Sequence, residues 1–452
     1  MTSNPQLESE RSTRIGFTTL VAIVVANMIG IGLFTSSGWS LGLLHHPGRV
    51  MLAWWICGVW AVCGAVAYGG LVSRLPQSGG EYLFLSRFVH PAIGFLAGWI
   101  SVVAGFTAPI AASALGAATY ALGQQDDELI WSTRAVAASL IAVATVCHLA
   151  GLAFGARVQN AIVGAKLSLL FIGVAYAYLF MPSTSWQGMP TNNVAGSWWP
   201  EDLSAWTVLA GSMSWIALSY TGFNAAIYVA GESQNARKNV PAAMVLATLL
   251  VTSLYLLVNY VFVYAPKPET IENQGRIATI VAEALGGPGL EMATRITIVL
   301  SMTSSVFAML LAGPRVYYRM AEDRVLPSLF LAGGKYPAAA ILVQATLSLV
   351  VVLNADLLSL LKYLGLTLSA CGALAVSSLW WVRSKLPDEA GLKWWESASL
   401  VVYLGITACI LWASRQTHAG EFNAMVLTFA LGLIVYMIGL GWQRRKSSPY
   451  IS

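Results

Sequence analysis

Two glycine-containing stretches have the composition to bind a small charged ligand through bare backbone. The first reads Ile-Gly-Ile-Gly-Leu-Phe over residues 29–34, and the second reads Ser-Tyr-Thr-Gly-Phe-Asn over residues 219–224. Glycine has no Cβ, so a helix can unwind there and a ligand can approach the main chain. An unwound helix offers free N–H groups to an anion and free carbonyls to a cation. Each stretch therefore predicts a break inside an apolar segment, with close helix packing at small residues as the alternative.

Lys166 also has chemistry of its own, because it is the one ionisable residue well inside an apolar stretch. A charge in that position costs roughly 2.5 to 3.5 kcal/mol on insertion scales. Either its ammonium reaches the cytoplasmic edge of the bilayer on its flexible stem, or a buried partner compensates it.

The elements that position these residues must be membrane helices. Of the 452 residues, 57% are hydrophobic and only 10% are charged, and the mean hydropathy is +0.68. Soluble domains carry about 25% charged residues. A net charge of +5, diluted in apolar sequence, argues against a nucleic-acid surface. The composition predicts one all-α polytopic protein embedded in the lipid bilayer.

Apolar runs between polar breaks predict twelve transmembrane helices. They lie near residues 15–43, 51–72, 92–122, 135–151, 161–181, 206–231, 242–265, 292–313, 337–354, 357–382, 397–414 and 422–441. Most of the 25 Lys and Arg residues fall on the side that holds both termini, so the positive-inside rule places both termini in the cytoplasm. All five cysteines lie in apolar runs and no Asn-X-Ser/Thr site occurs. These features fit a bacterial inner membrane and an absence of structural disulfides.

The first and sixth predicted spans share an interruption. The first, 15–43, would be about 43 Å long as one helix, against roughly 30 Å of hydrocarbon, so it tilts or breaks. Glycine-interrupted spans in corresponding positions of two halves indicate inverted repeats around one central site. The predicted organisation is a cytoplasmic tail (1–14), a first five-helix repeat (15–181), a second inverted repeat (206–382), helices 11 and 12 (397–441) and a C-terminal tail (442–452).

Four short motifs carry a family resemblance. Residues 29–34 resemble Ile-Gly-Ser-Gly-Ile-Phe of the amino acid-polyamine-organocation (APC) superfamily, and residues 74–82 are similar to its Arg-Leu-Pro-x-Ser-Gly-Gly-Glu-Tyr motif. Gln159-Asn160 with Lys166 resembles the start of its span 5, and residues 315–327 resemble the loop after span 8. The resemblance covers spans 1–10 and is closest to the L-type and bacterial amino acid permeases. It implies a secondary transporter of α-amino acids that works by alternating access, with no cofactor and no bound metal.

An α-amino acid presents a carboxylate and an ammonium, which match the two kinds of helix end. We expect backbone groups at the breaks around Gly30 and Gly222 to bind both. The predicted ligands are the N–H groups of Ile31, Gly32 and Leu33 for the carboxylate, and the carbonyls of Ile29 and Leu218 or Ser219 for the ammonium.

The sequence departs from the family pattern at two positions of this site. Ile31 replaces the family serine, and Leu218 replaces the aromatic gate of L-type members. We expect Trp215 or Phe223 to cover the substrate instead, with helix packing as the alternative. Asn224, just after the second break, either orients the substrate or satisfies the loose helix end.

Lys166 acquires a specific role through the resemblance. In sodium-independent members the span-5 lysine places its ammonium where sodium-coupled relatives bind their ion, which implies the Gly30 carbonyl and Ser304 or Ser305 as partners. Because burial favours the neutral amine, Lys166 is a candidate carrier of a coupling H+; a permanently charged Lys166 would fit a sodium-independent exchanger. Ser304 and Ser305 also resemble the hydroxyl pair that binds the ion in sodium symporters. Sodium-coupled transport therefore remains an alternative.

The charged residues limit the predicted substrate. All 20 acidic residues lie in loops or at span ends and no arginine lies in mid-span, which favours neutral amino acids. Glu81 and Glu232 lie on the cytoplasmic side, where they either gate access through ion pairs or anchor helix ends.

The sequence gives little support to an enzyme, to a channel or to a disulfide-linked partner protein. An intramembrane enzyme would need a catalytic cluster at depth, and a channel would need a filter loop or a ring of charges; neither is evident in the sequence. L-type relatives pair with a glycoprotein through a loop cysteine, but residues 123–134 contain no cysteine. A disulfide-linked heavy chain is therefore not expected.

Overall fold

The chain is mostly α-helical, as predicted. The computed structural model describes residues 15–123, 130–150, 156–180, 186, 197–322, 326, 328–331, 338–385 and 391–446. Its first helices are α2 (Phe17–Met28), α3 (Ile31–Leu44), α4 (Pro47–Arg74), α5 (Gly80–Phe88), α6 (Pro91–Ile100), the π-helix η1 (Ser101–Thr107), α7 (Ala108–Leu122), α8 (Ile130–Leu149) and α9 (Ala156–Phe180). The predicted tail 1–14, the end of the tail 442–452 and part of the motif at 315–327 lie outside the described residues.

The second half of the chain is also mostly helical. It contains α10 (Leu203–Tyr220), the 3-10 helix η4 (Ala225–Glu232), α11 (Ala236–Tyr264), α12 (Pro268–Ile271), α13 (Ile277–Glu322), η5 (Ser328–Leu331), α14 (Ala338–Asn354), α15 (Leu357–Ser377), α16 (Leu379–Lys385), α17 (Trp394–Thr417) and α18 (Ala419–Lys446). Over the described ranges the only β-type pairing is an isolated bridge between Ile15 and Ser233.

The length and hydropathy of these helices confirm an all-α polytopic membrane protein. In the part of the chain that the structure describes, eight helices are long and apolar enough to cross a bilayer, and α2 with α3 forms a ninth as a pair bent by 41°. The remaining predicted spans, at 161–181, 206–231 and 337–354, coincide with α9, α10–η4 and α14, which are shorter or less apolar by the same measure. The count of twelve stays a prediction.

One span begins earlier than predicted. The sequence placed its start near residue 292, whereas α13 begins at Ile277. Gly286 and Gly287 leave helical geometry, with φ of +68° at Gly287, and Pro288 follows. The break at Gly286, Gly287 and Pro288 has a physical reason, because glycine and proline disfavour a helix interior. The helical turns before the break were missed.

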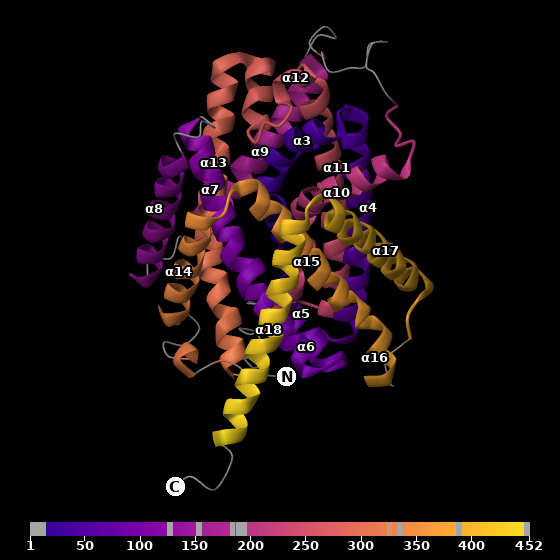
Figure 1. Cartoon of the computed structure of the whole chain (residues 1–452), viewed down its shortest axis with the longest axis vertical. Helices are drawn as coiled ribbons and strands as arrows, with labels where there is room; N and C mark the ends of the chain where they lie inside the picture. The colour runs from indigo at the N-terminus through magenta and orange to yellow at the C-terminus, as the bar shows by residue number, and fades with distance from the viewer. Residues whose placement is uncertain are drawn as a thin grey trace, which may run out of the picture.

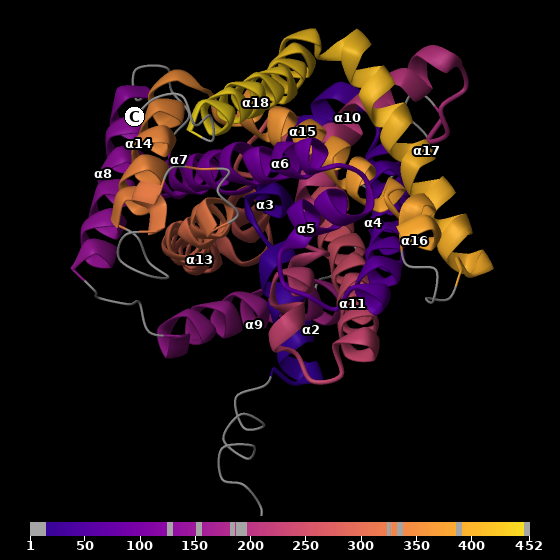
Figure 2. The ribbon, with the colours of Figure 1, turned by 90° about the horizontal axis from the view of Figure 1, so that it is seen from below.

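The helices assemble into two groups. Figure 2 shows α7, α8, α13 and α14 on one side, and α2, the first half of the broken first span, with α4 and α11 on the other. Small residues permit close packing between α4 and α11. A Cβ at Gly58 would lie 2.5 Å from Thr252 Cγ2, and one at Gly69 would lie 3.0 Å from Pro241 Cβ. This is the small-residue contact by which membrane helices approach one another.

The two ends of the molecule differ in their elements. Figure 1 shows α12 at the upper end and α5, α6 and α16 toward the lower end. Near the lower end Arg74, at the end of α4, forms a bidentate ion pair with Glu396 of α17, with N–O distances of 3.0 and 2.8 Å.

Candidate functional site

The first predicted break is present. α2 ends at Met28, Ile29 and Gly30 are extended, and α3 restarts at Ile31 with its axis turned by 41°. The first N–H groups of a helix have no intrahelical partner, and they lie at the positive end of the helix dipole. The predicted carboxylate ligands, the N–H groups of Ile31, Gly32 and Leu33, therefore form the first turn of α3.

The second break is present as well. α10 ends at Tyr220, Thr221 is extended, and the chain resumes as η4 at Ala225. Gly222 adopts a φ of +98°, a conformation that residues with a Cβ rarely tolerate. The glycine is thus required for the turn itself.

The two breaks touch each other. A Cβ at Gly222 would lie 2.8 Å from the carbonyl carbon and oxygen of Asn27, and one at Gly32 would lie 2.3 Å from Ser219 Oγ. The Tyr255 hydroxyl of α11 lies 2.6 Å from the Met28 carbonyl and 2.9 Å from the Ser219 carbonyl. The glycines therefore serve close backbone approach as well as unwinding.

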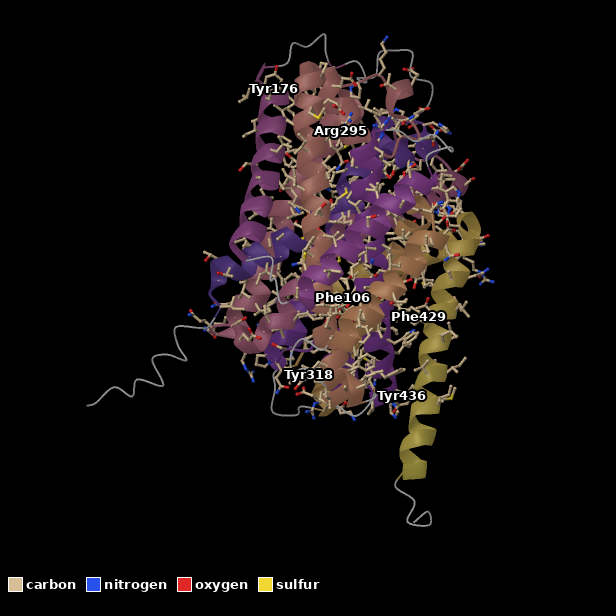
Figure 3. All side chains as sticks on the ribbon, turned by 90° about the vertical axis from the view of Figure 1, so that its left-hand side faces the viewer. Phe106, Tyr176, Arg295, Tyr318, Phe429 and Tyr436 are labelled. Atoms are coloured by element: carbon tan, nitrogen blue, oxygen red, sulfur yellow. The ribbon has the colours of Figure 1, made fainter. Side chains whose placement is uncertain are left out.

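A cavity of about 650 Å³ lies against both breaks. Its wall contains Asn27 to Gly32 from the first break and Leu218, Ser219 and Thr221 to Ala225 from the second. Phe106, also in the wall, lies near mid-height between Arg295 and Tyr318 in Figure 3. The cavity reaches down to Ser78, Val316 and Met320. It thus extends from mid-height toward the lower end, as an amino acid pathway would.

Above the breaks the structure is closed by buried hydrogen bonds. Ser36, Ser37 and Ser40 of α3 are all 0% exposed. The Trp54 indole donates to Ser37 Oγ (2.8 Å), which donates to Asn259 Oδ1. The Trp215 indole donates to Ser40 Oγ (2.9 Å). Access to the cavity is therefore from below in this conformation.

Lys166 lies at the first break rather than at the membrane edge. Its side chain is buried, lines the cavity, and donates a hydrogen bond of 2.6 Å to the Ile29 carbonyl. The expectation of the Gly30 carbonyl as partner is corrected by one residue. Ser304 and Ser305 also line the cavity, but their hydroxyls donate to the Ser301 carbonyl. Each donates to the helix carbonyl about one turn earlier, and the described hydrogen bond of Lys166 goes to Ile29 instead.

The carbonyls predicted for the ammonium already accept hydrogen bonds. Lys166 occupies one lone pair of Ile29, and the Tyr255 hydroxyl lies within hydrogen-bond distance of the Ser219 carbonyl. The Leu218 carbonyl accepts from both the N–H and the hydroxyl of Thr221. A carbonyl oxygen has two lone pairs, so Ile29 and Ser219 retain acceptor capacity, whereas Leu218 has its capacity filled.

The residues considered as a lid over the substrate occupy different places in the structure. Leu218 and Phe223 line the cavity, and the Phe223 ring packs at 5.8 Å from the rings of both Trp60 and Tyr68. Trp215 is buried beside Ser40 and His418, in the closed region above the breaks. Packing explains the position of Trp215, and Phe223 is the aromatic residue placed to contact a ligand.

Glu81 and Glu232 lie in different environments. Glu81 is buried and lines the cavity, where its carboxylate accepts hydrogen bonds from Tyr68, Asn224 and Tyr228. The Glu232 side chain is exposed at the end of η4. The sequence did not anticipate a carboxylate in the cavity wall, because Glu81 lies in the first turn of a short helix that appeared to be a loop.

Sequence reasoning also missed the tyrosines around the breaks, Tyr68, Tyr228 and Tyr255. Their side chains come from α4, η4 and α11, and each hydroxyl contacts a break or Glu81. A signal existed, because a tyrosine hydroxyl in a membrane span requires a polar partner. The identity of that partner depends on tertiary packing.

Comparison with known proteins agrees with this geometry. A family profile described as amino acid permease matches residues 15–440. The chain is 26% identical over 451 residues to the large neutral amino acids transporter small subunit 2 of Homo sapiens, covering 95% of this chain and 81% of that protein. It is 24% identical to the Homo sapiens Asc-type amino acid transporter 1 (95% and 83% covered) and 23% identical to the Mus musculus b(0,+)-type amino acid transporter 1 (96% and 90%).

These relatives are transporters, and the match spans both broken helices and the cavity between them. The alternative of an intramembrane enzyme is thereby set aside. The chain belongs to the amino acid permease family of the APC superfamily and is an integral membrane protein.

Proposed function

We propose that this permease moves neutral α-amino acids by alternating access without sodium, either together with a proton or in exchange for a second amino acid. The observation that carries the proposal is the contact of two broken helices at a cavity, with the Lys166 ammonium on the Ile29 carbonyl at the break. The steps below assign each part of the site a task in transport.

The substrate carboxylate binds the first turn of α3. The N–H groups there are free and carry the positive end of the dipole. The ammonium binds the remaining lone pairs of the Ile29 and Ser219 carbonyls. Charge-assisted hydrogen bonds of this kind contribute roughly 1.5 to 3 kcal/mol each. Because all these ligands are backbone groups, the replacement of the family serine by Ile31 leaves the grip on the zwitterion intact.

A neutral side chain fits the rest of the cavity. Leu361, Leu364 and Leu368 of α15 provide an apolar wall. The ionisable side chains of acid or base type in the described lining are Lys166 and Glu81, and both already have hydrogen-bond partners. One relative is named as a transporter of large neutral amino acids. These observations favour neutral over cationic or anionic substrates.

Alternating access requires the closed region above the breaks to open. The hydrogen bonds of Ser37 with Trp54 and Asn259, and of Ser40 with Trp215, link α3 to α4, α11 and α10. We assign Trp215 to this outer closure rather than to a substrate lid. Breaking these contacts while the lower end closes would expose the same site to the other side.

Lys166 supplies a positive charge beside the break without a bound ion. Its ammonium donates to the Ile29 carbonyl, so the break already carries a fixed positive charge at this point. This arrangement supports sodium-independent transport. A proton that leaves and returns to the amine would alter the hydrogen bond to Ile29 and thereby the geometry of the break.

The test is uptake by the purified protein in proteoliposomes. We expect saturable uptake of radiolabelled leucine and alanine, equal in sodium and choline buffers, with lysine and glutamate as poor competitors. Stimulation by an inward proton gradient would identify proton coupling, and stimulation by internal unlabelled amino acid would identify exchange. Sodium-dependent uptake would contradict the proposal.

Lys166→Ala tests the role of the lysine in the same vesicles. We expect it to lower uptake by at least about tenfold, since the broken helix loses a charge-assisted hydrogen bond, and to abolish any dependence on the proton gradient. The matched control is Lys267→Ala, which removes an exposed lysine next to α12. Full proton dependence in Lys166→Ala would remove this lysine from the coupling step.

A further inference from the structure

The carboxylate of Glu81 contacts three neutral donors in the cavity wall. Tyr68 of α4 donates to Oε1 at 3.0 Å, Asn224 donates to the same oxygen through Nδ2, and the Tyr228 hydroxyl of η4 donates to Oε2. Glu81 itself is 6% exposed and lies in the first turn of α5. One acidic side chain thus connects α5 to α4 and to the second half of the broken span.

The contact between Glu81 and Asn224 has a defined orientation. A carboxylate only accepts hydrogen bonds, whereas a carboxamide has a donating NH2 end and an accepting oxygen. Asn224 must therefore turn its NH2 group toward Glu81, which directs Oδ1 away from it. Asn224 lines the cavity, and no described residue donates a hydrogen bond to its Oδ1.

We propose that Glu81 is a positioning residue, which holds Asn224 so that its Oδ1 accepts a hydrogen bond from the substrate side chain. The inference rests on the proposed function and narrows it. The permease would favour neutral amino acids whose side chains carry a hydroxyl or amide donor over apolar ones of the same size.

The side chain is the part of the substrate that this oxygen would meet. The α-carboxylate and α-ammonium are accounted for by backbone groups at Ile29 to Leu33 and at Ser219. Asn224 comes two residues after Gly222, and its neighbours in the cavity wall are the side chains of Phe223 and Tyr228. A substrate hydroxyl gives up its hydrogen bond to water when it enters the cavity. If only apolar side chains lined the cavity here, nothing would replace that bond.

Threonine and valine provide the matched substrates, because they differ by a hydroxyl in place of a methyl group. We would measure the KM of both in one proteoliposome preparation and take the ratio of the valine KM to the threonine KM. This ratio does not depend on the amount of folded protein. Asn224→Leu is expected to lower the ratio by about two- to tenfold, the size of one hydrogen bond.

Substitutions of Glu81 separate positioning from packing. Glu81→Gln keeps the size but can donate to Oδ1 and let Asn224 turn round, so the ratio should fall as in Asn224→Leu. The aspartate in Glu81→Asp is shorter but, like glutamate, can only accept hydrogen bonds. The ratio of the valine KM to the threonine KM should therefore fall less in Glu81→Asp than in Glu81→Gln. A packing role predicts the opposite order. Glu283→Gln, an exposed carboxylate on α13, is the control and should leave the ratio unchanged.

Three results would overturn the inference: an unchanged ratio in Glu81→Gln, a higher ratio in Glu81→Gln than in Glu81→Asp, or an equal rise of both KM values in Asn224→Leu. Failure of the proposed function can be distinguished from failure of this inference, because the unmodified protein would then show no uptake. In that case thermal shifts with threonine and valine in detergent would supply the ratio of affinities instead.

Discussion

At the scale of single residues, Gly32 is where one methyl group should have the largest effect. A Cβ there would lie 2.3 Å from Ser219 Oγ and 3.1 Å from the Ser219 Cα, so α3 and α10 would have to separate. Overpacking of this kind costs about 1 to 3 kcal/mol. We expect Gly32→Ala to raise the KM for leucine by roughly tenfold, measured in proteoliposomes.

The control for this substitution is Gly405→Ala in α17. A Cβ at Gly405 meets no atom within 4 Å, so uptake should stay at the unmodified level. Its thermal stability should rise slightly, because alanine is favoured over glycine in a helix by about 1 kcal/mol. An unaltered KM in Gly32→Ala would show that the contact with Ser219 does not shape the site.

Some residues of the site could be predicted from the sequence and others could not. Gly30, Gly32 and Gly222 were predictable, because glycine in an apolar run has few physical explanations. The sequence predicted the Gly30 carbonyl as the partner of Lys166, whereas the structure shows the Ile29 carbonyl. Unwound backbone follows no periodic pattern, so the direction of each carbonyl could not be predicted. Tyr255 was missed because a tyrosine in an apolar helix does not reveal which distant carbonyl it will contact.

At the scale of elements, the ion pair between Arg74 and Glu396 fixes α17 to α4. The two side chains are 5% and 8% exposed, and Arg74 also donates to the Gly391 carbonyl. Removal of one member leaves a buried charge without its partner, which costs about 3 to 5 kcal/mol. We expect Arg74→Ala to lower the melting temperature in detergent, measured by thermal unfolding.

A second variant makes this prediction specific. Arg74→Leu combined with Glu396→Leu removes both charges, and apolar replacement of a buried pair is often neutral. The double variant should therefore unfold at a higher temperature than Arg74→Ala. Equal melting temperatures for Arg74→Ala and the unmodified protein would show that the pair contributes nothing.

His418, at the junction of α17 and α18, should make stability depend on pH. Burial, and then the nearby Lys362 ammonium, lower the pKa of its imidazole to about 4, while Glu421 acts in the opposite direction. Trp215 also packs against this ring. Because the unfolded chain takes up the proton near pH 6.5 and the folded chain does not, stability should fall as the pH drops from 6.5 toward 4.

The measurement for His418 is a series of melting temperatures between pH 4 and pH 8. His418→Gln, which cannot be protonated, should show a smaller loss of stability across the acidic part of the series. An identical pH dependence in the variant and the unmodified protein would assign the effect to other groups.

Element types were easier to predict than element ends. Hydropathy alone identified the apolar spans, because a bilayer excludes unpaired backbone and selects helices. It could not show that residues 101–107 form a π-helix within one of them. The segment ends at a tertiary contact, in which Ser348 Oγ of α14 donates to the Thr107 carbonyl at 3.0 Å.

At the scale of the whole molecule, the inverted-repeat arrangement that the sequence predicts would explain why the breaks meet. Each half contributes one broken span, and the two breaks lie in contact beside the cavity. Sequence positions predicted this meeting only through the symmetry of the repeats. They could not predict that the cavity extends to the lower end while the upper end is closed, because both conformations share one sequence.

The orientation of the molecule follows from charge and can be tested by labelling. Loops on the side of α5 hold most Lys and Arg residues, so α5 should face the cytoplasm and α12 the outside. Figure 1 places these two helices toward opposite ends. Arg87 of α5 and Lys267 beside α12 are both exposed. On a background without the five native cysteines, each can be replaced by cysteine.

In right-side-out vesicles we expect a membrane-impermeant maleimide to label Lys267→Cys at once and Arg87→Cys only after permeabilisation. Labelling of the denatured proteins supplies the control for the amount of each variant. The opposite pattern would invert the molecule in the membrane. The cavity that reaches the lower end would then open to the outside, and the closure formed by Ser37, Ser40 and Trp215 would face the cytoplasm.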